Sequence, residues 1–376
     1  MTRVPFDGVT YRRLLRLAFA DRPGRGRGLL LVAVAVLFPL WSAANQLFLL
    51  LDELLFPAWR RTPLREPVFV IGHARSGTTL MHTLLARDAR FSFFRTWEMF
   101  LPSITQKKIV DGLVALDRRL GRPLARRVEA FEERAFAKGR QMHPMGLANP
   151  EEDEFLLLLA FATPVLAMIF PHQSELNRLF FFDRLPERQR RRVLDFYEDV
   201  VRRQLWLRGG TRHLSKNPVF VGKLRSLVER FPDARFVLME RHPYETIPSI
   251  LKMMERNWKA VGGDRETIRR ELRVLGELSF DYYTYALEVL DGLPPGRRAI
   301  VAYEDLVARP AKTIEQVYAR LGLPLSPAFA ERLAEEEKRS RAHRSEHVYS
   351  LEEYGIPRAE IRSRLAPLFE RFGWEG

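Results

Sequence analysis

Pro67-Val-Phe-Val-Ile-Gly-His-Ala-Arg-Ser-Gly-Thr-Thr-Leu80 is the stretch that decides the fold. It begins with four consecutive apolar residues, Val68–Ile71, a run typical of a parallel strand that is covered on both faces. Gly72 and Gly77 then have the spacing of a Walker loop, but Thr78 stands where that loop has its lysine. Loops of this kind bind phosphate oxygens through backbone N–H groups and the N-terminus of a helix. The sequence therefore predicts an anion-binding loop that does not serve ATP hydrolysis.

Arg75 is the cation within this loop and stands two residues before Gly77. The sequence Arg-Ser-Gly-Thr-Thr after an apolar strand resembles the 5′-phosphosulfate loop of sulfotransferases that use 3′-phosphoadenylyl sulfate (PAPS). The resemblance is strongest to the bacterial and tyrosylprotein branch, where arginine often replaces lysine. It implies an α/β fold with a P-loop-type parallel sheet flanked by helices, a catalytic role for Arg75, and no metal. The residues implied to bind the 5′-phosphosulfate are Arg75, Ser76, Gly77, Thr78 and Thr79.

Three later segments resemble further parts of that family's site. Arg241, at the end of an expected strand, and Ser249, on the helix after it, resemble the 3′-phosphate site. Lys216, in Lys-Asn-Pro, resembles the lysine that contacts the transferring group, which implies that it stabilises the leaving phosphate oxygen. Tyr303, in Tyr-Glu-Asp-Leu, resembles the segment that closes the adenine pocket. The resemblance covers roughly Pro67 to Leu325 and implies one site at the carboxyl ends of the strands.

The expected general base is Glu98, which lies where the tyrosylprotein and related bacterial enzymes place a catalytic glutamate. Aromatic and apolar residues surround it within Phe91–Phe100, and such surroundings make a carboxylate a stronger base. His143 is the alternative base, because the cytosolic branch of the family uses a histidine. His73, inside the loop, is expected to shape the loop. Arg341 to Tyr349 are expected to add contacts to the 3′-phosphate.

Composition limits the choice of partners. The chain has 376 residues, 46% of them hydrophobic and 29% charged, which is typical of a globular protein. A net charge of +14 favours an anionic partner. The basic residues are nevertheless scattered over helical segments such as Glu187–Arg203, and no zinc-finger or RNP motif occurs, so no nucleic acid is expected. The absence of cysteine excludes disulfides and a cysteine nucleophile, and it favours a cytosolic catalytic part.

Residues 1–62 differ in composition from the rest of the chain. Residues 1–28 hold seven arginines against two aspartates, and Leu29–Leu51 carries no charge and is long enough to span a bilayer. Two helices broken near Pro39 and lying in the cytoplasmic leaflet are favoured, because PAPS is cytosolic and both flanks are basic. A single span and a buried soluble hairpin remain open. A membrane-associating segment 1–62 and a catalytic domain 63–376 are therefore expected, on the cytoplasmic face of a membrane.

Strand-like and helix-like segments alternate after the loop. Strands are expected at His213–Lys216, Arg235–Glu240 and Ala299–Tyr303, with helical spacing between them. This alternation predicts βαβ units and a parallel sheet. A helix is also expected over Glu151–Met168, because an acidic first turn follows Asn149-Pro150.

The acceptor side of the site is less determined by the sequence. Core packing is the favoured role for most residues of Phe91–Phe100 and Phe155–Phe170, and the two stretches are also candidates for lining an acceptor channel. Together with the N-terminal segment they favour a hydroxyl on a lipid, glycolipid or sterol-like molecule over a protein tyrosine. Two other classes stay open: a P-loop nucleotide kinase, although the loop lysine is missing, and a non-catalytic membrane-bound nucleotide-binding protein. The oligomeric state is not determined.

Overall fold

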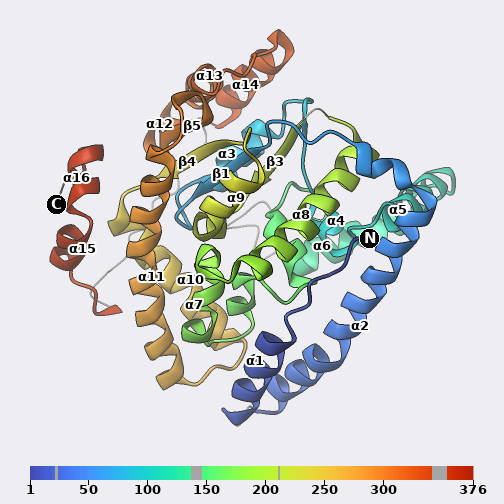
Figure 1. Cartoon of the computed structure of the whole chain (residues 1–376), viewed down its shortest axis with the longest axis horizontal. Helices are drawn as coiled ribbons and strands as arrows, with labels where there is room; N and C mark the ends of the chain where they lie inside the picture. Colours follow the sequence, from blue (N-terminus) through green and yellow to red (C-terminus); the bar gives the residue numbers. More distant parts are fainter. Residues whose placement is uncertain (22–23, 137–145, 211, 341–353, 376) are drawn as a thin grey trace.

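Five parallel strands form the sheet at the centre of the molecule (Figure 1). The structure, a computed structural model, describes residues 1–21, 24–136, 146–210, 212–340 and 354–375. The strands are β1 (Val68–Gly72), β2 (Phe91–Ser92), β3 (Arg212–Lys216), β4 (Arg235–Glu240) and β5 (Arg298–Ala302). Their order in the sheet is β2-β3-β1-β4-β5. The predicted parallel α/β fold is confirmed, and the strand β2 is an element that the sequence pattern did not indicate.

Alternate residues of the central strand β1 belong to two hydrophobic cores, one on each face of the sheet. Val68 and Val70 belong to one core and Phe69 and Ile71 to the other, as the two-residue period of a strand requires. The first core is covered by α3 (Thr78–Leu85), α12 (Tyr303–Ala308), α13 (Pro310–Arg320) and α14 (Pro327–Ser340). The second is covered by α7 (Gln173–Phe180), α8 (Glu187–Arg208), α9 (Leu224–Arg230), α10 (Pro243–Ala260) and α11 (Arg265–Asp291). The sheet is thus the middle of three layers.

Further helices complete the fold, and one predicted helix is wrong. The remaining helices are α1 (Gly8–Ala20), α2 (Arg25–Leu55), α4 (Thr96–Phe100), α5 (Ile104–Arg119), α6 (Pro123–Phe136), α15 (Arg358–Arg364) and α16 (Ala366–Phe372). The segment 151–168 forms two 3-10 turns, η2 (Asp153–Leu158) and η3 (Pro164–Met168). Its carboxylates are drawn into buried ion pairs, and Pro164 cannot continue a helix from the residues before it.

Helix α2 runs without interruption through Pro39, so the expected break there is wrong. Proline has no N–H group and leaves the carbonyl four residues earlier without its helical donor. That carbonyl belongs to Ala35, and the hydroxyl of Tyr11 on α1 donates to it at 2.5 Å. A side chain from the neighbouring helix therefore replaces the hydrogen bond that would otherwise be lost.

The N-terminal helices α1 and α2 pack against the body of the molecule (Figure 1). Leu14 and Ala18 of α1, and Leu31 and Leu49 of α2, are buried in the same core as the helices on the α10 side of the sheet. One face of this helical hairpin is consequently part of the globular fold.

The chain leaves four strands at one edge of the sheet, where ligands of open parallel sheets bind. The loop after β1 carries Arg75, β3 ends in Lys216, Arg241 follows β4, and Tyr303 follows β5. Because parallel strands end on the same side, residues separated by more than two hundred positions meet there.

Candidate active site

The loop between β1 and α3 adopts backbone conformations that suit its glycines. Gly72 has φ +149°, and a Cβ there would lie 2.4 Å from the carbonyl oxygen of Met239. Gly77 has φ +92° and a Cβ would lie 2.5 Å from the ring of Tyr303. Arg75 also has a positive φ, of 74°, which an L-residue adopts only at a cost. Strain at this position, in a loop that opens a helix, agrees with a binding role for Arg75.

The structure brings the predicted nucleotide residues together. Arg75 Nε donates to Ser249 Oγ at 3.2 Å, and Arg241 Nη1 donates to the carbonyl of Arg75 at 3.2 Å. The guanidinium carbon of Arg241 lies 4.1 Å from the centre of the Tyr303 ring. Arg241 Nε also donates to Glu245 Oε2 at 2.8 Å, so an incoming anion would share this arginine with a carboxylate. The parts proposed for the two phosphates and the adenine thus lie side by side.

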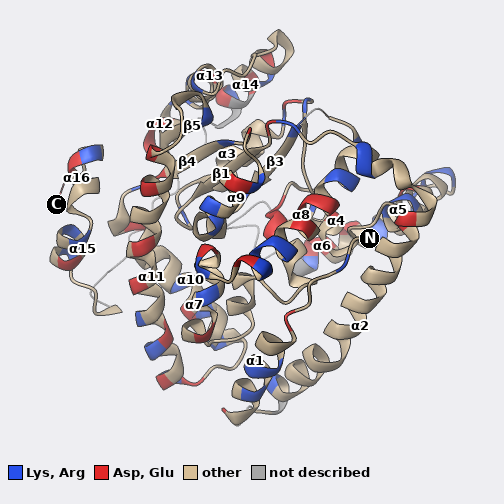
Figure 2. Ribbon diagram, in the orientation of Figure 1, with Lys and Arg blue, Asp and Glu red and all other residues tan. Residues whose placement is uncertain are grey.

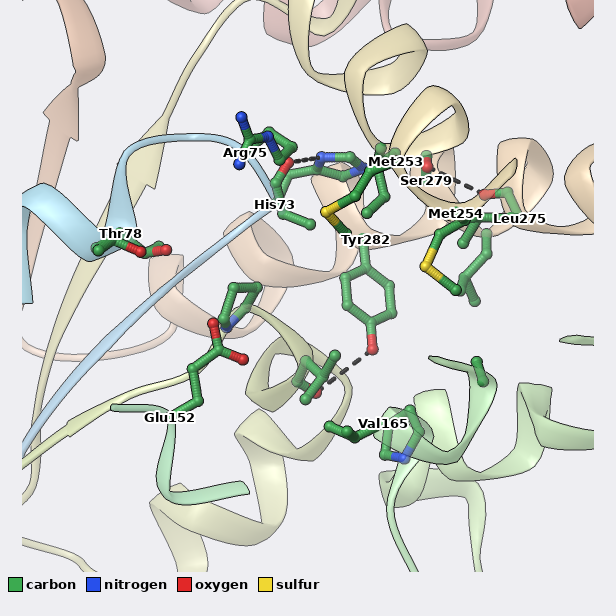
Figure 3. A pocket seen from close by; sticks show the side chains of 18 of the residues that line it. His73, Arg75, Thr78, Glu152, Val165, Met253, Met254, Leu275, Ser279 and Tyr282 are labelled. Atoms are coloured by element: carbon green, nitrogen blue, oxygen red, sulfur yellow. Dashed lines mark hydrogen bonds between the residues drawn. The ribbon is translucent and has the colours of Figure 1, made fainter. Parts of the chain in front are cut away.

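A cavity of about 520 Å³ opens beside this loop (Figure 3). Arg75, Thr78 and Glu152 lie towards one end, and Met253 and Met254 lie towards the other. Arg241, Thr79 and Tyr303 also line the cavity, whereas Ser76 and Ser249 do not. Ser76 is fully buried beneath the loop, where its hydroxyl has no partner. The cavity therefore joins an anion-binding end to an apolar end.

Lys216 is paired with two glutamates that the sequence had placed in a helix. Its Nζ lies 2.8 Å from Glu152 Oε1 and 3.5 Å from Glu151 Oε1. Lys216 itself is completely buried, and Glu152 is the member of the pair that lines the cavity. The pair therefore presents the Glu152 carboxylate to the cavity, with the Lys216 ammonium group behind it.

Asp153 anchors the segment that carries Glu152. One of its oxygens accepts from Ser215 Oγ at 2.8 Å, and the other lies 2.9 Å from His213 Nε2. Asn217 and Tyr197 also donate to this carboxylate. Burial and the neighbouring Asp153 raise the pKa of Tyr197 well above its ordinary value, so the phenol stays a donor. These bonds tie the acidic segment to the end of β3 and fix the position of Glu152.

A second buried ion pair lies next to this anchor. Lys223 Nζ donates to Glu154 Oε1 at 2.9 Å, and both side chains are completely buried. Burial raises the pKa of Glu154, while the Lys223 ammonium group opposes that shift. Three consecutive carboxylates, at positions 152 to 154, are thus each matched to a buried partner on the segment from β3 to Lys223.

The structure does not bring Glu98 to the cavity. Its Oε2 accepts from the backbone N–H of Arg95 at 2.9 Å and from Gln204 Nε2 at 3.0 Å. Its Oε1 accepts from Arg208 Nε at 2.7 Å. The side chain is 1% exposed and does not line the cavity. Both carboxylate oxygens are thereby committed to the start of α4 and to helix α8.

Of the two stretches considered for an acceptor channel, one lines the cavity. No residue of Phe91–Phe100 does so; Phe91, Phe94 and Met99 are buried in the hydrophobic cores, which is the role favoured for most residues of that stretch. From Phe155–Phe170 the turn η3 does contribute. The rest of the apolar end comes from helices that the sequence did not single out: Phe180, Ile250, Met253, Met254, Leu275, Leu278 and Tyr282.

Of the two histidines considered from the sequence, the structure describes His73 but not His143. His73 lines the cavity, stacks on Tyr283 with ring centres 4.9 Å apart, and places its Nδ1 2.7 Å from the carbonyl of Ala74. Burial lowers the pKa of His73 to about 4, so its ring is neutral at pH 7 and shapes the loop, as expected. His143 and the segment 341–349 lie outside the residues that the structure describes. Across the described parts of the chain, no three His, Asp or Glu side chains form a group that could hold a metal ion.

Glu152 and the methionines are the residues that the sequence reasoning missed. The run Glu151-Glu-Asp-Glu154 was an available signal, because four carboxylates in a row exceed what one helix start needs. Lys216 and Lys223 supplied the complementary charges. No comparable signal marked Met253 and Met254, since apolar residues at helical spacing look the same whether they line a core or a cavity.

Comparisons with known proteins show the family of the chain and its fold. A sequence model described as the sulfotransferase family matches residues 67–327. The omega-hydroxy-beta-dihydromenaquinone-9 sulfotransferase Stf3 of Mycobacterium tuberculosis is 24% identical over 379 residues, covering 97% of this chain and 88% of the relative. The same protein of Mycobacterium bovis matches equally.

Two solved structures share the fold. Sulfotransferase STF9 from Mycobacterium avium has a TM-score of 0.70 at 18% identity, covering 98% of both chains. Sulfotransferase STF1 from Mycobacterium tuberculosis has a TM-score of 0.66 at 19% identity, covering 98% of this chain and 100% of its own. At such identities the likeness establishes the architecture of the chain.

Proposed function

The chain belongs to the sulfotransferase family, and we propose that it moves a sulfuryl group from PAPS to a hydroxyl of a hydrophobic acceptor, releasing adenosine 3′,5′-diphosphate (PAP). The observation that carries the proposal is the cavity that joins Arg75 and Thr78 to the methionine-lined space between α10 and α11. Family membership gives the sulfuryl transfer and disfavours the kinase and the non-catalytic binder. The donor, the acceptor and the roles of individual residues are our proposals.

The donor is proposed to lie along the strand ends. Arg75 faces the sulfonate as a planar fork, and Thr78 and Thr79 add hydroxyl donors to the backbone N–H groups at the start of α3. Ser76 and Gly77 shape that turn. The residues fit such a ligand because an arginine, two hydroxyls and a helix start converge on one end of the cavity.

The other end of the donor is proposed to lie beside β4 and β5. Arg241 binds the 3′-phosphate, and Ser249 holds Arg75 in place through its hydroxyl. The Tyr303 ring, packed against Gly77 and under the Arg241 guanidinium, borders the adenine. On phosphate binding, the Arg241 fork exchanges Glu245 for a more highly charged partner.

Glu152 is proposed as the general base in place of Glu98. The acceptor oxygen attacks sulfur, the bond from sulfur to the 5′-phosphate oxygen breaks, and the acceptor proton passes to the Glu152 carboxylate. Lys216 holds that carboxylate through its 2.8 Å contact, and Arg75 stabilises the SO3 group as it transfers. Charge leaves with the phosphate oxygen, so atoms and charge balance without a further reactant.

The acceptor is proposed to be the hydroxyl end of a long apolar molecule, such as a hydroxylated prenyl lipid. Methionine side chains adapt to irregular ligands, and Met253 and Met254 line that wall together with Leu275 and Leu278. The name of the mycobacterial relative, an omega-hydroxy-dihydromenaquinone sulfotransferase, describes an acceptor of this type. Residues 1–62 are proposed to associate with the cytoplasmic face of a membrane and 63–376 to be the catalytic domain.

Transfer to lipid tests the proposed function directly. The purified chain is incubated with sulfur-labelled PAPS and a membrane lipid extract, and the organic phase is analysed for labelled product. We expect label to enter a lipid fraction and PAP to be released in equal amount. The matched control is Arg75→Ala, which removes the cation at the sulfonate. A chain that transfers no label, releases no PAP and binds no PAP in calorimetry would overturn the proposal.

The apolar end has its own test. Met254→Trp fills the space away from the loop and should raise KM for a long-chain alcohol about tenfold, by removing room for its tail. A short alcohol does not reach this wall, so its KM should change less than about twofold. Equal effects on both alcohols would place the acceptor tail elsewhere.

A further inference from the structure

Helix α2 is apolar on both faces, and its few uncharged polar groups lie on the face that contacts the body, where Leu31 and Leu49 are also buried. The face that contacts the body carries polar groups: Ser42 Oγ donates to the carbonyl of Leu159 at 2.8 Å, and Asn45 Oδ1 accepts from Gln106 at 3.0 Å. The opposite face is exposed and apolar. We call the exposed residues of that face the α2 strip; they are Leu29, Leu30, Val32, Val36, Leu37, Leu40, Leu47, Leu51, Leu54 and Leu55.

A helix on the surface of a water-soluble protein normally exposes polar and charged residues on its outer face, which α2 does not. Leu29 and Leu54, near the two ends of α2, are 73% and 74% exposed, and Leu40 between them is 61% exposed. At about 1.5 Å per residue, the strip extends roughly 40 Å. An apolar surface of this length, without a charge along its middle, marks an interaction site.

Helix α5 also exposes apolar side chains and is joined to the end of α2. The carboxylate of Asp52 on α2 accepts the backbone N–H groups of Ile104 and Thr105, at 2.8 and 2.9 Å, which fixes α5 at the end of α2. Along α5 the side chains of Ile109 and Leu113 are about half exposed, at 51% and 52%. Two helices with a fixed connection therefore both expose apolar side chains.

Buried charges hold α2 against the body. Arg203 of α8 is completely buried; its Nε donates to Asp52 at 3.1 Å and its Nη2 donates to Glu53 at 3.0 Å. Glu53 also accepts from the backbone N–H of Thr2 at 3.0 Å. By length and composition Gly26–Leu55 could cross a bilayer. Crossing would take Ser42 and Asn45, in the middle of the helix, away from Leu159 and Gln106 and leave their polar groups without these partners, which is costly.

Cations border the α2 strip. Arg12 and Arg16 are exposed on α1, Arg61 follows α2, and Lys108 and Arg118 are exposed on α5. Figure 2 shows the middle of α2 without charged residues and lysines or arginines in the neighbouring segments. An anionic lipid surface complements both features, apolar strip and basic border. A second copy of this chain would bring the same cations against each other across a two-fold interface.

We propose that α2 lies in the plane of an anionic membrane surface, with the α2 strip in the acyl region, and does not cross the bilayer. The proposal rests on the proposed function only in the choice of the cytoplasmic leaflet. Lipid binding needs neither donor nor acceptor, so the two can fail separately. An apolar acceptor would then reach a protein that is already at the membrane.

Vesicle binding tests the surface. The full chain is mixed with vesicles of phosphatidylcholine alone or with added phosphatidylglycerol, and bound protein is measured by flotation. We expect stronger binding to the anionic vesicles and a loss of about 100-fold in the triple variant Leu37→Gln/Leu40→Gln/Leu47→Gln. The control Val307→Gln changes an exposed residue outside the strip and should alter binding less than about twofold.

Depth of insertion tests the orientation. The chain has no cysteine, so Leu29→Cys, Leu40→Cys and Leu54→Cys each give one site for a fluorescent label. With quenchers at defined bilayer depths, the proposal predicts the same shallow depth at all three. A deep position 40 between two shallow ends would overturn it in favour of a span. Absence of vesicle binding would overturn the proposal that the α2 strip binds lipid. A dimer in solution that the triple variant dissociates would also overturn it.

Discussion

Two glutamates, each paired with a cation, behave differently in this molecule: Glu98 is buried, whereas the side chain of Glu152 is 24% exposed. The Glu98 cluster joins that residue to Arg208, Gln204 and the start of α4, and both carboxylate oxygens are used within the fold. The Glu152 cluster joins that residue to Lys216 and leaves its side chain on the cavity wall. The chemical group is the same in both places. Access to the cavity, which depends on contacts far apart in the sequence, distinguishes a proposed base from a structural carboxylate.

Lys216→Met breaks the Glu152 cluster without changing Glu152, and it should cause the largest loss of turnover among such substitutions. Methionine keeps most of the side-chain volume but leaves the carboxylate without its 2.8 Å partner. We expect turnover to fall about 10²- to 10³-fold, or roughly 3–4 kcal/mol in the barrier, as for other single stabilising donors. PAP affinity by calorimetry should change little. Turnover within threefold of the natural chain would show that the pair does not serve the reaction.

A substitution in the Glu98 cluster should instead change the free energy of unfolding and its dependence on pH. Lys107 is buried in it, with Nζ 4.9 Å from the centre of the Phe94 ring, and burial lowers the pKa of Lys107 from 10.5 to about 8. Between these values the unfolded chain binds more protons than the folded chain, so this lysine makes stability rise with pH. Lys107→Met should remove that rise, which amounts to at most about 3 kcal/mol.

Denaturant unfolding at several values between pH 8 and pH 10.5 measures this difference. Lys108→Met, which changes the exposed neighbour, is the control and should keep the pH dependence. Turnover at pH 7.5 should be retained in both variants. If the free energy of unfolding depended on pH equally in the two variants, Lys107 would not have the lowered pKa that its burial causes.

Asp153→Asn should have a smaller effect, because Asp153 positions Glu152 without touching the cavity. The amide keeps the size but replaces one acceptor oxygen with a donor that faces Ser215 or His213. We expect kcat to fall about tenfold, with KM for PAPS unchanged, since the donor contacts other residues. A change in KM for PAPS alone would mean that this network supports the phosphate loop instead.

The residues proposed to bind the donor could be selected from the sequence because they lie on short motifs. Arg75, Arg241 and Tyr303 each follow an apolar strand, and parallel strands bring their carboxyl ends together. Tertiary contacts decide the rest. The acidic run after Asn149 has the sequence of a helix start. In the structure its carboxylates form ion pairs with Lys216 and Lys223, and the segment forms 3-10 turns.

Pro39 illustrates the same limit on the N-terminal side. The sequence correctly indicated a long apolar segment, but the break at the proline depended on whether the freed carbonyl of Ala35 would find a donor. Tyr11 supplies it from α1, twenty-four residues earlier. The sequence showed that Pro39 removes a helical hydrogen bond. Only the packing of α1 against α2 showed that the Tyr11 hydroxyl replaces it.

The most direct test of the two-glutamate comparison is the turnover of Glu152→Gln and Glu98→Gln, measured side by side with labelled PAPS and an acceptor alcohol, with PAP affinity as the control. The account predicts a loss of about 10²- to 10⁴-fold for Glu152→Gln at unchanged PAP affinity, and a change of less than about threefold for Glu98→Gln. Retained turnover in Glu152→Gln, together with its loss in a folded Glu98→Gln, would contradict the account.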